Sequence, residues 1–113
     1  MVNKILEASG FVKNETYKKT RFIKPPKKTY AVYNDDYSVS GSDDIALLIR
    51  KSITIEVYEY RPDKEVIRKI ENSLDAYYPL MVDGWKKEDR YYIDSENIYQ
   101  TVYTFEYIEK RGV

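Results

Sequence analysis

The chain has 113 residues, of which 42% are hydrophobic and 34% are charged, so we expect a single globular domain, 1–113, with one modest core. It contains no histidine and no cysteine, which excludes disulfides, thiolate metal sites and a Ser-His-Asp triad and removes the commonest general base. Its 19 basic and 19 acidic residues cancel, so net charge gives no reason to expect nucleic-acid binding. We therefore expect neither catalysis nor a bound cofactor or metal.

The first third of the chain predicts a short helix followed by two strands. Apolar residues recur at helical spacing over 2–9, and Gly10 suits the left-handed position that ends a helix. The segment 12–28 then carries seven basic residues and one acidic residue. Within it we expect a strand near 16–23, which ends before two prolines, and after it a second strand over 29–34.

The middle of the chain predicts a loop, a long strand and a long helix. Residues 35–44, DDYSVSGSDD, are acidic and rich in serine, so we expect a loop or a flexible hairpin tip. Strict alternation of apolar and polar side chains from Ser52 onward predicts a strand over 46–60. The segment 62–78 predicts the longest helix, because Pro62 suits its first position and an apolar stripe repeats at helical spacing.

The last third predicts three further strands, near 81–87, 90–94 and 97–109. Strands cluster between the helices instead of alternating with them, so the pattern indicates an α+β domain. We expect a mostly antiparallel sheet of about five strands packed against one long helix, plus a short N-terminal helix.

The final strand carries the most distinctive side chains. Its tyrosine-bearing face consists of Tyr99, Thr101, Tyr103, Phe105 and Tyr107. Three interpretations of this face are open: the core beneath the long helix, a contact with a neighbouring subunit, and a platform on which single-stranded nucleic acid stacks. Two glutamates close by argue against the last of these.

Charges of opposite sign gather in two segments, which are candidate partner contacts. The basic candidates are Lys18, Lys19, Arg21 and Lys24, and the acidic candidates are Asp35, Asp36, Asp43 and Asp44. In a ring of identical subunits, the basic patch of one copy would face the acidic segment of the next. The competing interpretation of the lysines is a solvated strand edge that resists aggregation.

Two further features have a structural interpretation beside the functional one. The acidic candidates lack the alternating ligands and central glycine of an EF-hand loop, so we interpret them as solvated acids rather than a calcium site. Trp85 directly follows an Asp-Gly pair and is either a core anchor or a partner contact.

Five stretches together give the chain a resemblance to a known family. They are PPKKTYAVY at 25–33, NDDYSVSGSDD at 34–44, ITIEVYEY at 53–60, DKEVIRKIENSLD at 63–75 and YIDSENIYQTVYTFE at 92–106. In this order they resemble the small neck or tail-completion proteins of long-tailed phages and prophages, which include tail terminators and tail-to-head joining proteins. The last stretch is the most distinctive.

The resemblance implies a structural virion-assembly protein rather than an enzyme. Its copies would form a hexameric ring at the head-proximal end of the tail tube, with the oligomeric state of the isolated chain left open. Its partners would be itself, the tail tube protein and the head-completion or connector protein, with DNA only passing through the ring and no membrane contact. It would reside in the virion, and in the bacterial host cytoplasm during assembly.

The alternative is a small nucleic-acid-binding module that uses the basic segment 13–28, where Tyr17 and Phe22 interleave with the basic side chains. A small enzyme, or a regulator of one, is a third interpretation, and the lack of histidine and cysteine argues against the enzyme.

Overall fold

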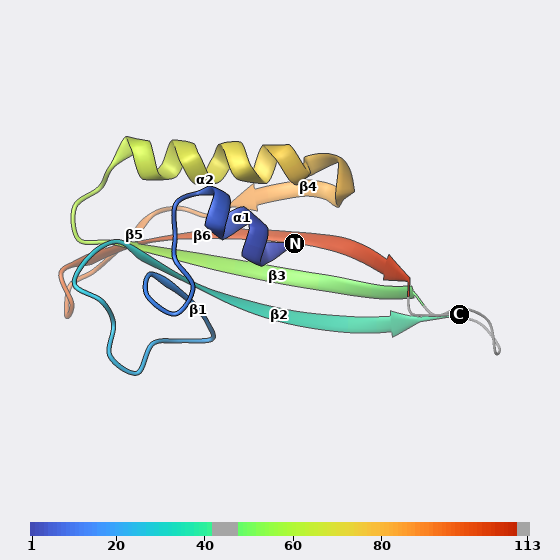
Figure 1. The fold of residues 1–113 in the computed structure, drawn as a ribbon, viewed down its shortest axis with the longest axis horizontal. Helices are drawn as coiled ribbons and strands as arrows, with labels where there is room; N and C mark the ends of the chain where they lie inside the picture. Colours follow the sequence, from blue (N-terminus) through green and yellow to red (C-terminus); the bar gives the residue numbers. More distant parts are fainter. Residues whose placement is uncertain (42–47, 111–113) are drawn as a thin grey trace.

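The computed structural model describes residues 1–41 and 48–110, which form two α-helices, a 3-10 turn and six strands. In chain order the elements are α1 (Val2–Ala8), β1 (Tyr17–Lys19), β2 (Tyr30–Ser40), β3 (Leu48–Glu59), α2 (Lys64–Tyr77), the 3-10 turn η1 (Tyr78–Leu80), β4 (Met81–Lys87), β5 (Tyr91–Ile93) and β6 (Ile98–Lys110). The molecule is elongated, with extents of 51 × 28 × 23 Å. Figure 1 shows α2 running alongside β4. Neither helix in the described ranges is long and apolar enough to cross a bilayer.

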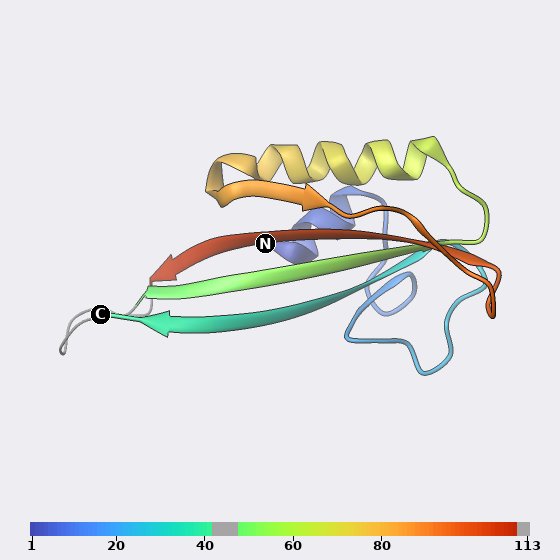
Figure 2. The ribbon, with the colours of Figure 1, turned by 180° about the vertical axis from the view of Figure 1, so that it is seen from behind.

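The sheet has the strand order β1-β2-β3-β6-β4, and β5 pairs with the part of β6 that β4 leaves free. Every neighbouring pair is antiparallel except β1 and β2, which run parallel. Figure 2 views the sheet from the side that α1 does not cover. The two faces of the sheet therefore differ, with a helix face and an opposite face.

The expectation of about five mostly antiparallel strands is wrong, because six strands form a mixed sheet within an α+β fold. Residues 20–29 lead the chain from the end of β1 back to the start of β2, so these two strands run in the same direction. The Ala31 N–H donates to the Thr16 carbonyl at 2.8 Å. The Thr20 N–H donates to the Tyr33 carbonyl at the same distance. The relative direction of two strands depends on the path of the segment that connects them. The composition of residues 20–29 does not reveal that path.

The acidic segment expected to be a loop is instead partly strand. Residues 35–40 continue β2 and pair with β3 in an unbroken register that ends with Ser40 opposite Leu48. Local composition favours a turn here, but pairing with a long neighbouring strand satisfies the backbone groups and overrides that preference. Asp43 and Asp44, the other acidic candidates, lie outside the described residues.

The main core lies between the two helices and the odd-numbered side chains of β3 and β6. Ile55 of β3, Tyr103 of β6, Leu74 of α2 and Ile5 of α1 are fully buried and belong to one cluster. Burial of each aliphatic side chain of this size contributes roughly 1.5–3 kcal/mol. The Tyr103 hydroxyl also donates to Glu71 of α2 at 2.8 Å, so the tyrosine-bearing face of β6 is core at its centre.

A second, smaller cluster covers one end of the opposite face. Tyr30, Val32 and Ile98 are buried there. The Tyr58 ring stacks on Tyr30 at 4.9 Å between centroids, and Phe22 meets the same ring edge-on at 5.5 Å. The sheet is thus covered on both faces at one end only.

A bulge interrupts β4 at Asp83 and Gly84, where the register with β6 shifts. Both residues have positive φ, 60° and 72°, which favours glycine and aspartate at these positions. The ring of Tyr78 lies against Gly84, so a side chain at this position would overlap the ring.

We expect Gly84→Ala to lower the free energy of unfolding by about 1–3 kcal/mol, because left-handed strain adds to the cost of displacing the half-exposed Tyr78 ring. Gly10→Ala is the matched control, since Gly10 also has a positive φ, 97°, but has open space around it. That control should lose only the strain contribution, about 1–2 kcal/mol. Urea denaturation of both variants measures the difference. Equal losses would mean that the Tyr78 ring moves aside without cost.

Two buried tyrosines predict a loss of stability in alkaline solution. Burial raises the pKa of Tyr17 and of Tyr30 from 10.0 to about 12, and the hydrogen bond that Tyr17 donates to Glu7 adds to the shift of the Tyr17 pKa. The unfolded chain loses these protons near pH 10 while the folded chain keeps them to about pH 12. Stability is therefore fully present below pH 10 and falls as pH rises toward 12. Urea unfolding across this range measures the slope, which Tyr17→Phe should make shallower.

Candidate functional site

Three strands continue beyond the helices at one end of the sheet and form a projecting arm, made of residues 34–40, 48–52 and 106–109 (Figure 1). No side chain of the arm is buried, and every residue of 34–40 is exposed. Of the arm residues only Tyr107 packs against the main core cluster, so most of this long ordered element lies outside the core. Such an element indicates a surface used for contact with another molecule.

The arm exposes large apolar side chains. Tyr37 is 60% exposed and Val39 is 43% exposed, and they share the helix face of the sheet. Leu48 and Ile108 are 38% and 45% exposed and lie on the opposite face. Four such side chains on a narrow arm leave apolar surface in water on both faces, and covering that surface with a partner is favourable.

Polar contacts hold the three strands of the arm together. The Arg50 guanidinium donates to Glu106 at 2.7 Å across the β3–β6 boundary, and the Ser52 hydroxyl donates to the same carboxylate at 3.3 Å. Hydrogen bonding to Arg50 lowers the pKa of the Glu106 carboxyl below its usual value. The Lys51 amine lies 5.5 Å from the centre of the Tyr37 ring, within the range of a cation–π contact. The arm is thus braced between its strands on both faces.

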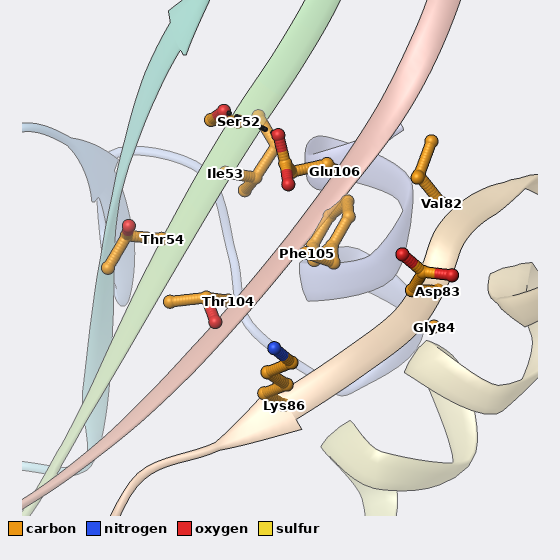
Figure 3. A pocket seen from close by; sticks show the side chains of 10 residues that line it. All are labelled: Ser52, Ile53, Thr54, Val82, Asp83, Gly84, Lys86, Thr104, Phe105 and Glu106. Carbon is orange, nitrogen blue, oxygen red and sulfur yellow. Dashed lines mark hydrogen bonds between the residues drawn. The ribbon is translucent and has the colours of Figure 1, made fainter.

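A groove of about 370 Å³ lies at the base of the arm, where the bulge of β4 parts from β6. Its lining, shown in Figure 3, consists of Ser52, Ile53, Thr54, Val82, Asp83, Gly84, Lys86, Thr104, Phe105 and Glu106. Ser52 and Glu106 are the nearest approach to a nucleophile and base, but Arg50 lowers the pKa of Glu106 and makes it a weaker base. Among the described residues, no group of three potential metal ligands occurs. The groove is suited to polar contacts with a partner.

The basic candidates lie at the edge of the sheet beside β2. Lys18 and Lys19 belong to β1, and Arg21 and Lys24 follow it in the connection to β2. Lys19 forms an ion pair with Asp35 of the same chain at 3.1 Å. The structure therefore brings one basic and one acidic candidate together within a single subunit.

Two other candidates have local partners of their own. Asp36 lies on β2 and accepts a hydrogen bond from the backbone N–H of Tyr37 at 2.8 Å. Trp85 lies on β4, where its indole N–H donates to Asp75 of α2 at 2.9 Å and its ring meets Tyr103 edge-on. Trp85 is half-buried between helix and sheet, which is the arrangement of a core anchor.

One buried charge was not singled out by the sequence. Glu59, at the end of β3, is fully buried, accepts from the Asp63 N–H at 2.9 Å and lies 3.5 Å from Arg90. Burial raises the pKa of the Glu59 carboxyl above its usual value. The contacts join the start of α2 to the turn after β4, so they position elements rather than form a reactive site.

The exposed apolar residues of the arm were also missed. The signal was present in the alternation of Tyr37 and Val39 with serines, which is a strand pattern. The neighbouring aspartates and glycine outweighed it and favoured a loop.

No family model matches the chain, and no curated protein matches it significantly. Among solved structures it is similar to a chain of one described as "Virion of native gene transfer agent (GTA) particle", with a TM-score of 0.57 and 11% sequence identity. The match covers 95% of this chain and 84% of that chain. At this identity the likeness shows a shared fold over nearly the whole molecule.

We expect Glu106→Gln to loosen the arm, because it weakens the charged contact with Arg50 that joins β3 to β6. Amide hydrogen exchange should become faster in residues 48–52 and stay unchanged in 53–57, which lie over the core. Glu65→Gln, which removes an exposed ion pair with Arg68 on α2, is the matched control and should leave the arm unchanged. Unaltered exchange in 48–52 would mean that backbone pairing alone holds the arm.

Proposed function

We propose that this protein is a structural subunit of a phage-like virion and acts through assembly without catalysis. The similar chain comes from a virion particle, and the likeness extends over 95% of the present chain. The ordered stretches of sequence that resemble tail-completion proteins add independent support. The more specific form of the proposal is a ring at the head-proximal end of the tail tube, as a tail terminator or a head-to-tail joining protein.

The observation that carries the proposal is the projecting arm. It displays Tyr37, Val39, Leu48 and Ile108 to solvent, and these four side chains belong to neither cluster of buried residues. A subunit that works alone gains nothing from such a surface, whereas a subunit of an assembly buries it against its neighbours.

The mechanism is geometric. Copies joined edge to edge through their sheets would close into a ring, because a head-to-tail contact generates a ring when its rotation closes. The two sides of that ring carry different side chains and would meet different partners, the tail tube on one side and the connector under the capsid on the other. DNA would pass through the ring.

The observations favour nucleic-acid binding less. Lys19, in the middle of the basic segment, is already paired with Asp35, which reduces the charge available for phosphate. An exposed apolar arm also contributes nothing to binding that depends on phosphate contacts.

The test is the mass of the purified protein by light scattering, alone and mixed with tail tube protein, followed by electron microscopy. We expect ring-shaped hexamers in at least one of the two conditions. Tyr37→Ser should weaken the assembly, because it removes exposed apolar surface from the arm. Tyr91→Ser removes a tyrosine of β5 that is 49% exposed, against 60% for Tyr37, and should have no effect. A chain that stays monomeric in both conditions would overturn the proposal.

A further inference from the structure

We propose that neighbouring subunits join by extending the sheet, with the free edge of β2 in one copy pairing antiparallel with the outer edge of β4 in the next. The inference rests on the proposed function, since it supplies the contact that would build the ring. It names a second copy of this chain as the occupant of the arm.

Among the described residues, no strand pairs with the outer edge of β2 along the arm. The Ala31 N–H and the Tyr33 carbonyl form hydrogen bonds with the residues that flank β1. The odd-numbered residues of β2 therefore direct their backbone N–H and carbonyl groups away from β3. β1 ends opposite Tyr33, and the same alternation directs the groups of Tyr37 and Val39 outward beyond it. The Tyr37 N–H is satisfied by the side chain of Asp36 at 2.8 Å instead of by a strand. An incoming strand can replace that carboxylate with a backbone carbonyl.

The outer edge of β4 is open in the same way. β4 forms the last position in the strand order, and among the described residues no further strand pairs with it. Tyr78 and Leu80, directly before β4, are 52% and 62% exposed. The outer edge of β4 therefore also combines backbone groups without a strand partner with exposed apolar side chains nearby.

The strand directions make the two edges compatible. β2 is antiparallel to β3, β3 to β6, and β6 to β4, so β2 and β4 run in opposite directions within one subunit. A second copy placed beside the first in the same orientation therefore sets its β2 antiparallel to the first copy's β4. The contact uses two different edges, so it is head-to-tail and leaves a free edge at each end for further copies.

The register is set by the part of the β2 edge that the chain leaves free. The Thr20 N–H donates to the Tyr33 carbonyl at 2.8 Å, just beyond β1, so the same chain occupies this edge as far as Asn34. Setting Val39 opposite Met81 of the next copy places the whole of β4 beyond β1. In this register the exposed apolar side chains on the helix face of the arm are covered by the next copy.

Charge complementarity supports the same alignment. Asp36 and Lys86 both lie on the face of the sheet opposite the helices. With Val39 opposite Met81, and with the bulge of β4 left unpaired, Lys86 of one copy lies directly opposite Asp36 of the next. Opposite charges then meet at the boundary of two subunits.

The absence of cysteine from the chain makes disulfide linking a direct test, because introduced thiols are the only ones present. We expect Asp36→Cys protein mixed with Lys86→Cys protein to form a linked dimer on oxidation, because opposite residues bring their Cβ atoms within disulfide range. Asp35→Cys mixed with Lys86→Cys is the matched control, since Asp35 points to the other face and should not link. Self-linking of Asp36→Cys alone would show two β2 edges meeting each other and would overturn the proposal.

A second test blocks the edge without altering the core. Val39→Pro removes an outward N–H that β3 does not use, so the subunit should fold while assembly drops at least tenfold in affinity. Val39→Thr keeps the N–H and should assemble nearly normally. Asp36→Lys and Lys86→Asp should each weaken assembly, and combining both should restore it. Equal assembly of the proline and threonine variants would overturn strand pairing.

The results separate this inference from the proposed function. Rings without the Asp36–Lys86 link would overturn the pairing and leave the structural role intact. Linked open filaments would support the pairing and overturn the ring. A chain that neither links nor assembles with tail tube protein would overturn both.

Discussion

The antiparallel ladder between β3 and β6 is the feature on which the rest of this structure depends. It runs without a register shift from Leu48 opposite Lys110 to Glu59 opposite Tyr99. One half lies over the main core, where Ile55 and Tyr103 are fully buried, and the other half lies in the arm. Because the two halves share the same hydrogen-bonded strands, the stability of the core extends into a part of the molecule that has no core of its own.

This continuity explains how a small domain can hold an exposed surface in a defined shape. An isolated hairpin of this length would be marginal in water, whereas strands anchored in a packed sheet are not. The contact between Arg50 and Glu106 adds local bracing at the point where helix cover ends. The arm therefore offers a partner a surface that is already ordered, which lowers the entropic cost of binding.

Several features followed from local pattern. The apolar stripe around Ile70 and Leu74 indicated the helix that covers the sheet, and alternation after Ser52 indicated the central strand. Local pattern did not predict the parallel pairing of β1 with β2, since this pairing depends on the path of residues 20–29. The continuation of β2 through residues 35–40 did not follow either, because the neighbouring strand, not local composition, decided it.

The amino-acid sequence by itself determined which side chains are available, since it contains no histidine and no cysteine. It also determined the α+β class, since helical and strand periodicities are local properties of the chain. Only the tertiary structure decided which charges are satisfied within the subunit, as Lys19 is by Asp35, and which apolar side chains stay exposed on the arm. These outcomes depend on register and on where the helices end over the sheet, which are relations between distant segments that no local pattern contains.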